Sequence, residues 1–259
     1  MATYLDRILA RHREVAAADD RRVEDLIEQA LACAPIRSFA AALAPTEHLA
    51  VISEIKRRSP SKGVLREGLD PAEFAQIYAE AGAACLSVLT DAEFFGGSPQ
   101  DLQAARQACA LPVLRKDFTV CAHDVVDARL MGADCVLLIA AALSQTELVE
   151  LHDVATRIGL DVLVEIHDEP ELERALEAGA RIVGVNQRDL VTFEVDHARA
   201  VRMGALIPDS VIKVAESGVR GPQDAAALYG AGYQAVLVGE TLVTATDPGA
   251  TLRSLRVAR

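Results

Sequence analysis

Charged and amide side chains stand at the ends of several short apolar runs in this chain. Glu54 and Lys56 end one run two residues apart, and Lys116 and Phe118 end another with the same spacing, so each pair shares one face of an extended strand. Later runs end in the same kinds of residue, namely Glu165, Asn186, Arg188 and Glu216. Lysines beside carboxylates supply both an acid and a base for general acid–base catalysis near neutral pH.

Two glycine-containing turns follow the last two apolar runs. Ser217 and Gly218 come directly after Glu216, and Gly239 and Glu240 follow the final run. Small residues let backbone N–H groups approach an oxyanion, as they do in many phosphate-binding barrels. A glycine after a strand is often only a turn, but two such turns after adjacent strands favour a phosphate site.

The overall charge limits the class of ligand. The formal net charge is −12 at pH 7, which argues against nucleic acid because phosphate backbones need clustered cations. An acidic protein can still bind an anion where cations gather, and Lys56, Lys116 and Arg188 are candidates for such a cluster. We predict that crowding among cations lowers the pKa of Lys116 and that burial raises the pKa of Glu165.

The apolar runs alternate with helical patterns along the chain. The eight runs are 50–55, 85–89, 112–114, 135–139, 162–164, 182–185, 211–215 and 235–238. Intervening segments such as Pro71–Gly82 and Pro99–Cys109 begin with proline and end near a small residue, which is typical of helix termini. Alternating strands and helices of this number predict an α/β fold, a (β/α)₈ barrel with its active site at the carboxyl ends of the strands. An open doubly wound sheet is the alternative, but no G-x-G-x-x-G follows the first run.

Residues 1–48 carry amphipathic helical patterns and precede the first strand. We expect a single barrel domain over residues 1–259, with 1–48 as a helical extension packed on the barrel. Hydrophobic residues make up 51% of the chain, enough for a large core. Five cysteines without CxxC spacing, the absence of a signal-peptide pattern, and no apolar run long enough to span a bilayer predict a cytoplasmic protein.

Several segments together resemble the indole-3-glycerol phosphate synthase family of tryptophan biosynthesis. The most specific is Glu54-Ile-Lys-Arg-Arg-Ser-Pro-Ser-Lys-Gly63, which resembles the first-strand signature of that family. The resemblance extends from about Arg37 to the last helix, through the segments 89–91, 95–98, 114–118, 165, 185–190, 215–218 and 238–240. One departure is Gln187, where asparagine is more usual, and strand alternation points this side chain away from the pocket.

The resemblance implies a carbon–carbon lyase acting on 1-(2-carboxyphenylamino)-1-deoxyribulose 5-phosphate. The ring carbon that bears the carboxylate attacks the sugar carbonyl, CO₂ leaves, and dehydration completes the indole. It implies neither a cofactor nor a metal. We expect a monomer whose partner is this small anionic substrate and not nucleic acid or a membrane.

The resemblance also assigns roles to individual residues. Lys116 is the general acid at the carbonyl oxygen, and Glu165 acts as acid or base in the dehydration. Lys56 contacts substrate anions and can also donate a proton, so the division of acid work between the two lysines stays open. Glu54 and Asn186 hydrogen-bond the reacting centre and the sugar hydroxyls.

The remaining implied contacts surround the substrate. The substrate-binding set is Ser59, Phe95, Phe118, Leu137, Arg188, Leu190, Glu216 and Leu237. The phosphate-binding set is Ser217, Gly218, Gly239 and Glu240. Within the first set, the Phe and Leu residues are expected to form the slot for the aromatic ring, because the chain has no Trp. Of the adjacent pair Phe94 and Phe95, only Phe95 is assigned to the pocket.

Other interpretations of these residues compete with the family assignment. A phosphoribosylanthranilate isomerase would need a cysteine and an aspartate at the strand ends, and a barrel that only binds ligand would lack Lys116 or Glu165. Lys62 is either part of a mobile lid or a solvated loop residue, and Lys213 should point towards a helix. The six histidines lack metal-ligand spacing and are expected to be surface or helix residues.

Overall fold

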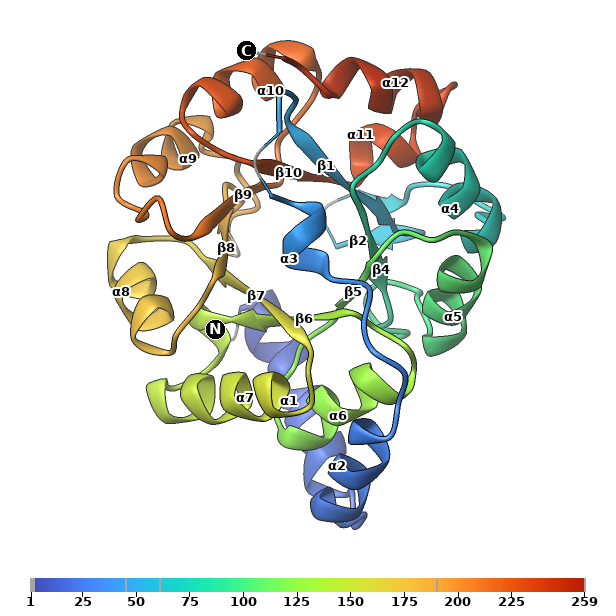
Figure 1. Ribbon diagram of the computed structural model, residues 1–259, viewed down its shortest axis with the longest axis vertical. Helices are drawn as coiled ribbons and strands as arrows, with labels where there is room; N and C mark the ends of the chain where they lie inside the picture. Colours follow the sequence, from blue (N-terminus) through green and yellow to red (C-terminus); the bar gives the residue numbers. More distant parts are fainter. Residues whose placement is uncertain (1–2, 45, 61, 190, 259) are drawn as a thin grey trace.

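Eight parallel strands form a closed barrel in the computed structural model, which describes residues 3–44, 46–60, 62–189 and 191–258 (Figure 1). Around the barrel the order is β1, β10, β9, β8, β7, β6, β5 and β4, and β4 closes on β1. The strands are β1 Ala50–Ile55, β4 Cys85–Leu89, β5 Val113–Lys116, β6 Cys135–Ile139, β7 Asp161–Ile166, β8 Ile182–Asn186, β9 Ile212–Glu216 and β10 Ala235–Val238. The predicted (β/α)₈ barrel is confirmed, with strand ends shifted by at most two residues.

Helices cover the outside of the barrel and connect its strands. They are α4 Pro71–Glu80, α5 Pro99–Ala108, α6 Ala122–Leu130, α7 Gln145–Arg157, α8 Glu169–Glu177, α9 His197–Gly204, α10 Pro222–Gly230, α11 Glu240–Val243 and α12 Pro248–Leu255, with a 3₁₀ turn, η1, over Ala140–Ala142. Asp70, Ser98 and Asp168 cap three of these helices by accepting backbone N–H groups of the first turn. The two short strands β2 Arg58–Ser59 and β3 Gly63–Val64 form a hairpin in the loop after β1.

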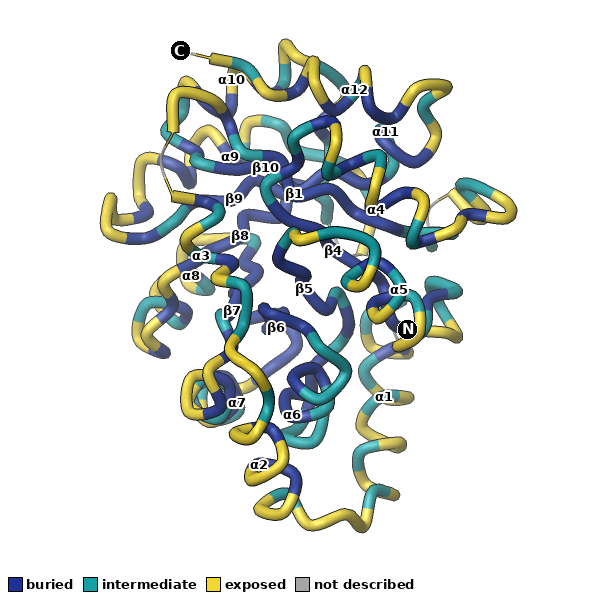
Figure 2. The backbone as a smooth tube through the Cα atoms, turned by 45° about the vertical axis from the view of Figure 1, so that its right-hand side comes forward, coloured by how far each residue is buried: buried dark blue, intermediate teal, exposed yellow. Residues whose placement is uncertain are grey.

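The N-terminal segment runs from one end of the barrel to the other (Figures 1 and 2). Helix α1, Tyr4–Ala17, contacts loops at the carboxyl ends of the strands, where Arg13 donates to the Ala142 carbonyl. Helix α2, Val23–Leu31, packs along α6. Helix α3, Phe39–Ala42, lies at the amino ends, where the Ala40 N–H donates to Asp161 at the start of β7.

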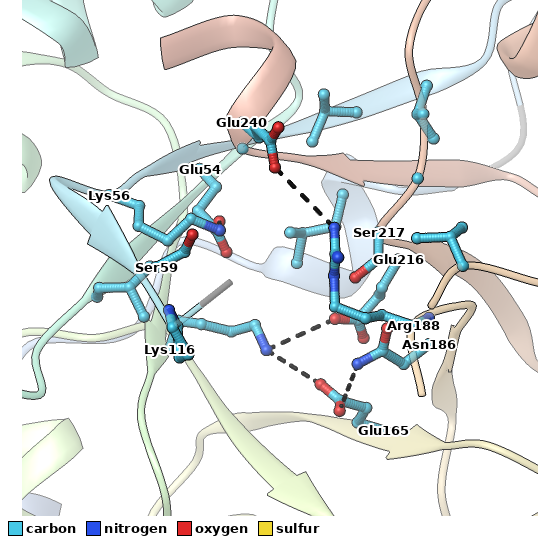
Figure 3. A pocket seen from close by; sticks show the side chains of 18 of the residues that line it. Glu54, Lys56, Ser59, Lys116, Glu165, Asn186, Arg188, Glu216, Ser217 and Glu240 are labelled. Carbon is cyan, nitrogen blue, oxygen red and sulfur yellow. Dashed lines mark hydrogen bonds and ion pairs between the residues drawn. The ribbon is translucent and has the colours of Figure 1, made fainter. Parts of the chain in front are cut away.

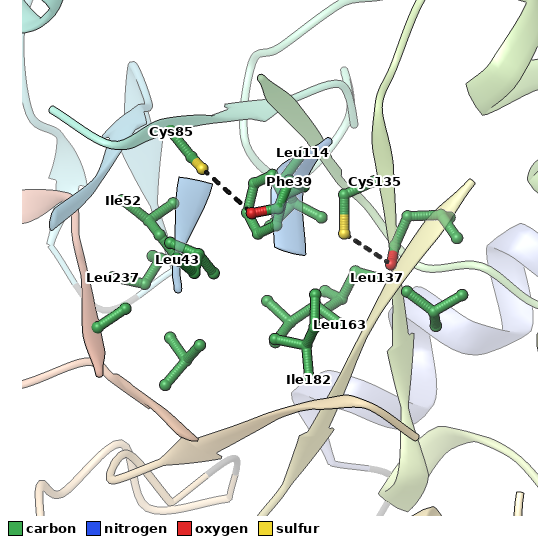
Figure 4. Packing of buried hydrophobic residues seen from close by; sticks show 14 of the residues in the cluster. Phe39, Leu43, Ile52, Cys85, Leu114, Cys135, Leu137, Leu163, Ile182 and Leu237 are labelled. Carbon is green, nitrogen blue, oxygen red and sulfur yellow. Dashed lines mark hydrogen bonds between the residues drawn. The ribbon is translucent and has the colours of Figure 1, made fainter. Parts of the chain in front are cut away.

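A plug of apolar side chains fills the amino-terminal half of the barrel. Phe39 and Leu43 are fully buried and face inward-pointing aliphatic residues of the strands, among them Ile52, Leu114, Leu137, Leu163, Ile182 and Leu237 (Figure 4). Each such buried side chain contributes about 1.5–3 kcal/mol of transfer free energy. Packed side chains therefore close this end of the barrel.

Among the residues that the structure describes, no helix combines the length and apolar composition needed to cross a membrane.

Candidate active site

A cavity of about 450 Å³ opens at the carboxyl ends of the strands (Figure 3). Its lining includes every residue of the expected catalytic, substrate-binding and phosphate-binding sets that the structure describes: Glu54, Lys56, Ser59, Phe95, Lys116, Phe118, Leu137, Glu165, Asn186, Arg188, Glu216, Ser217, Gly218, Leu237, Gly239 and Glu240. Leu190 lies outside the described residues. These residues come from all parts of the sequence after residue 50, some from the strands and the others from the loops that follow them. Alternation along the strands turns the strand side chains towards one space.

The Lys116 ammonium occupies the floor of this cavity among carboxylates. Its Nζ lies 3.0 Å from Oε2 of Glu165 and 3.6 Å from Oε2 of Glu216. Asn186 donates from Nδ2 to the other Glu165 oxygen at 2.9 Å, which fixes the orientation of that carboxylate. Glu165 and Glu216 are each about 2% exposed, so these charges interact with little solvent screening.

The predicted directions of the pKa shifts were wrong for both Lys116 and Glu165. Burial alone would lower the pKa of Lys116, but the surrounding carboxylates of Glu165, Glu216 and Glu54 raise it. Burial alone would raise the pKa of Glu165, but Lys116 and His167, with the Asn186 amide, lower it to about 2. The reason is that carboxylates outnumber ammonium groups on the cavity floor, a balance that sequence spacing does not reveal.

Glu216 is the carboxyl group whose pKa is raised. Burial and the neighbouring Glu165 carboxylate raise the pKa of Glu216 to about 8, against the opposing effect of Lys116. Its Oε1 has no hydrogen-bond partner within the described part of the chain. That oxygen lies over Gly184 of β8, where any Cβ would overlap it. Gly184 therefore provides the room that the Glu216 side chain occupies.

Lys56 is held by its own neighbour on β1. Lys56 and Glu54 form an ion pair, and both side chains are largely buried. Gly239 lies against the other side of Glu54, because a Cβ at Gly239 would overlap the Glu54 carboxylate. This arrangement places the Lys56 ammonium in the cavity while its carboxylate partner packs under the turn after β10.

The turns after β9 and β10 form the opposite side of the cavity. Ser217 and Gly218 both adopt positive φ, 65° and 75°, and Ser217 is one of two non-glycine residues in the described chain that do so. This conformation costs free energy in a residue with a side chain and recurs at functional sites. The Ser217 carbonyl accepts a hydrogen bond from Gln187, whose side chain is buried and does not line the cavity, in agreement with the expected orientation.

The Glu240 carboxylate lies close to two cationic side chains. It lies 3.9 Å from Lys62 Nζ and 4.0 Å from an Arg188 guanidinium nitrogen. Arg188 also donates to the carbonyl of Phe193 at 3.0 Å. Glu240 is the first residue of helix α11, so its backbone N–H is one of the donors left without an intrahelical partner at that helix start.

Aromatic and aliphatic side chains form the remaining wall. The rings of Phe95 and Phe118 lie 6.0 Å apart at 36°, and both line the cavity with Leu137 and Leu237. Phe94 lies elsewhere, since its ring packs edge-on against Tyr4 of α1. The choice of Phe95 over Phe94 is consistent with this placement.

Several lining residues were not in the expected set. Ile139, Phe193, Val195, His197 and Arg220 also face the cavity. Ile139 shares the strand alternation of Leu137 and could have been found by it. The other four belong to loops or a helix start after β8 and β9, where no periodic pattern indicates side-chain direction.

Lys213 points away from the cavity, as expected. Its Nζ donates to the carbonyl of Gly204 in α9 and lies 3.2 Å from Asp209. His12 lies in helix α1, as a helix residue was expected to, whereas His167 follows β7 outside any helix. The side chains of both are largely buried beside carboxylates. His167 lies behind the catalytic candidates, with Nε2 3.8 Å from Glu165 and Nδ1 3.1 Å from Glu171.

The sequence of this chain is similar to those of known proteins. A family model described as indole-3-glycerol phosphate synthase matches residues 5–255. An indole-3-glycerol phosphate synthase of Parafrankia sp. (strain EAN1pec) is 50% identical over 242 residues, covering 93% of this chain and 87% of the relative. One from Bordetella pertussis is 46% identical over 260 aligned positions, covering 98% and 99%.

A solved structure of thiamine phosphate pyrophosphorylase from Pyrococcus furiosus shares the fold alone. Its TM-score is 0.60 at 15% identity, with 81% of this chain and 94% of that chain covered. The sequence relatives and the family model together span nearly the whole chain. The chain therefore belongs to the indole-3-glycerol phosphate synthase family.

Proposed function

We propose that this protein converts 1-(2-carboxyphenylamino)-1-deoxyribulose 5-phosphate into indole-3-glycerol phosphate, with release of CO₂ and water. Membership of the family makes the chain a carbon–carbon lyase of tryptophan biosynthesis. The observation that carries the detailed proposal is the Lys116–Glu165 ion pair on the floor of a cavity with an apolar wall on one side and glycine turns on the other.

The two ends of the cavity suit the two ends of this substrate. Phe95, Phe118, Leu137 and Leu237 would enclose the aromatic ring, which needs apolar surroundings. The turns at Ser217-Gly218 and Gly239-Glu240 would bind the phosphate through backbone N–H groups. A substrate held at both ends places its carbonyl over the Lys116 ammonium in the middle.

Ring closure begins at that carbonyl. The ring carbon that bears the carboxylate forms a bond to the carbonyl carbon, and the electron pair of the C=O bond moves to oxygen. Lys116 donates its proton to this oxygen as negative charge develops. The raised pKa keeps Lys116 protonated at neutral pH, so the acid is in the required state before substrate arrives. CO₂ then leaves the same ring carbon and its bonding electrons restore the aromatic ring.

Dehydration completes the indole. Lys56 donates a proton to the hydroxyl made from the carbonyl oxygen, which leaves as water, and Glu165 removes the proton from the adjacent carbon of the new five-membered ring. The lowered pKa of about 2 keeps Glu165 ionised and able to accept that proton. Asn186 holds the Glu165 carboxylate in place through its 2.9 Å hydrogen bond.

Lys56 and its neighbours would hold the substrate carboxylate until it leaves. The Lys56 ammonium lies in the cavity on the β1 side, paired with Glu54, and Ser59 follows in the same loop. Arg188 adds a second cation on the β8 side. We further propose that the chain acts as one domain, since a single family model matches residues 5–255, and that it acts as a monomer.

Indole fluorescence tests this function directly. The protein contains no Trp, so newly formed indole would appear against a low background when the substrate is added to the purified protein. We expect a rising signal that is lost in Lys116→Ala. A folded wild-type protein that binds phosphate but forms no indole would overturn the proposal and favour an isomerase or a barrel that only binds ligand.

A further inference from the structure

His12 connects the N-terminal helix to two loops at the mouth of the barrel. Its Nε2 lies 3.2 Å from Oδ2 of Asp91, which follows β4, and 3.8 Å from Oδ1 of Asp117, which follows β5. Both carboxylates are only about 5% exposed, and the His12 side chain is 16% exposed. A single imidazole on α1 therefore lies between two buried acids from neighbouring strand ends.

Each of these acids anchors the backbone of one aromatic wall residue. Oδ1 of Asp91 accepts the N–H groups of Phe94 at 2.6 Å and Phe95 at 3.0 Å. Oδ1 of Asp117 accepts the N–H of Phe118 at 2.9 Å. Phe95 and Phe118, two of the phenylalanines that line the cavity, are thus each joined by one backbone hydrogen bond to a carboxylate that faces His12.

The His12 ring also touches the wall itself. Its centroid lies 5.6 Å from that of Phe118, which lies 6.0 Å from Phe95. His12 is not among the residues that line the cavity, so any effect on a ligand must pass through these neighbours.

We propose that His12 is a positioning residue that sets the spacing of Phe95 and Phe118 by linking Asp91 to Asp117. This inference rests on the proposed function, because it assigns those two rings to the aromatic end of the substrate. Residues from α1 would then contribute to substrate affinity without touching the substrate.

A metal ion is a poorer explanation for the same three side chains. His12, Asp91 and Asp117 offer ligand atoms within 4.8 Å of one another. However, an Arg115 guanidinium nitrogen lies 3.1 Å from Oδ2 of Asp117, and the Thr90 hydroxyl donates to the same oxygen. A metal cation bound between these three side chains would be repelled by the nearby Arg115 charge. The His12 imidazole can lie beside the two carboxylates in either its neutral or its charged form.

The surrounding charges favour the protonated imidazole. Burial alone would lower the pKa of His12, but the Asp91 hydrogen bond and the charges of Asp117, Asp91 and Asp124 raise it. Arg115 is the opposing cation from β5, on the far side of Asp117. On α1 itself, the neighbouring charges are Arg11, which pairs with Glu14 and Glu93, and Arg13, which pairs with Glu147.

His12→Ala tests the linkage, since alanine preserves helix α1. We expect the KM for the substrate to rise about tenfold, as for loss of a hydrogen bond to a charged group, with kcat changed less than KM. The dissociation constant of indole-3-glycerol phosphate should rise similarly, while that of glycerol 3-phosphate, which lacks an aromatic ring, should stay constant. His12→Gln, which keeps a donor, should recover most of the affinity.

Two control variants separate this role from simple docking of the N-terminal segment. Arg13→Ala removes the bonds from α1 to Glu147 and Ala142, and His123→Asn removes the bond to the Arg21 carbonyl. Neither anchors a wall phenylalanine, so both should leave KM near the wild-type value. An equal rise in KM in Arg13→Ala would overturn the proposal in favour of general docking.

The pH dependence provides a second readout. The wild-type KM should rise as pH increases through the His12 pKa, and His12→Gln should lack that rise. Glu216, whose pKa is raised to about 8, is present in both proteins, so the difference between their two KM profiles isolates His12. If wild type forms indole and His12→Ala keeps the wild-type KM, the positioning role fails while the proposed function stands. If wild type forms no indole, the proposed function itself fails.

Discussion

Lys116 and Glu165 face each other across 3.0 Å on the cavity floor, from the ends of β5 and β7, and each stabilises the charged form of the other. The pair is therefore an ammonium and a carboxylate in the free enzyme, which are the states that a proton donor and a proton acceptor need at the start of the reaction. Substrate that enters between the two side chains must replace part of this attraction. Both groups are already charged before the substrate binds, so neither has to change its protonation state first.

Glu165→Gln should separate proton transfer from binding. The amide keeps the size of the side chain and can still contact Asn186 and Lys116, but it cannot take up a proton. We expect kcat to fall about 10²- to 10⁴-fold, the usual contribution of a general base, while the product dissociation constant changes little. Indole formation under saturating substrate measures kcat.

The matched control for this variant lies on the next helix. Glu169→Gln makes the same chemical change at an exposed residue at the start of α8, and it should leave kcat unchanged. A Glu165→Gln protein with near wild-type kcat would show that another group removes the proton.

Glu216 should make stability depend on pH in the neutral range. Its folded-state pKa of about 8 lies above the usual 4.5, so between these values the folded protein binds more protons than the unfolded chain. The contribution of this group to the free energy of unfolding should therefore be fully present below pH 4.5 and should be lost as pH rises to about 8.

Urea unfolding at pH 5, 7 and 8.5 measures this dependence. Glu216→Gln removes the titrating group, so its free energy of unfolding should fall less than that of wild type over the same range. His12 and His167, whose pKa values are also raised, contribute to both proteins and cancel in the comparison. Parallel curves for the two proteins would refute the assignment of the raised pKa to Glu216.

Most residues of the site could be predicted from the sequence, but the directions of their pKa shifts could not. Strand alternation fixes side-chain direction, so Glu54, Lys116 and Glu165 could be assigned to one cavity from their places in short apolar runs. Their pKa shifts depend on distances between strands that are far apart in sequence. The Lys116–Glu216 separation of 3.6 Å, for example, joins residues 100 positions apart.

The loops and the N-terminal segment were harder to predict for a different reason. Helix α1 was recognisable from its apolar spacing, but nothing in that spacing indicates which end of the barrel it covers. The contacts of His12 with Asp91 and Asp117 arise only after three distant segments have packed together. The same holds for Phe193, whose backbone has positive φ in a loop without a glycine at that position.

Phe39→Ala should reduce stability without altering the chemistry. Phe39 is fully buried in α3 at the amino end of the barrel and does not line the cavity, and removal of a buried ring costs about 3–5 kcal/mol. The midpoint of urea unfolding should fall accordingly, while KM and kcat at low temperature should stay close to wild type. Leu31→Ala, at a residue that is 57% exposed, serves as the control and should change stability by less than about 0.5 kcal/mol.

Gly239→Ala should damage the site through Glu54. A Cβ at residue 239 would overlap the Glu54 carboxylate, which is buried and paired with Lys56, so the carboxylate cannot move without disturbing that ion pair. The same methyl group would stand in the turn proposed to bind phosphate. We expect kcat/KM to fall at least about tenfold, the effect of misplacing groups that orient a substrate, and the affinity for glycerol 3-phosphate to fall as well.

Gly221→Ala adds the same methyl group at the start of α10, where nothing lies within 4 Å and the backbone is extended, and it should leave both quantities unchanged. If Gly239→Ala retains wild-type kcat/KM, then the turn after β10 has enough freedom to absorb a side chain, and neither the placement of Glu54 nor phosphate binding depends on a glycine there.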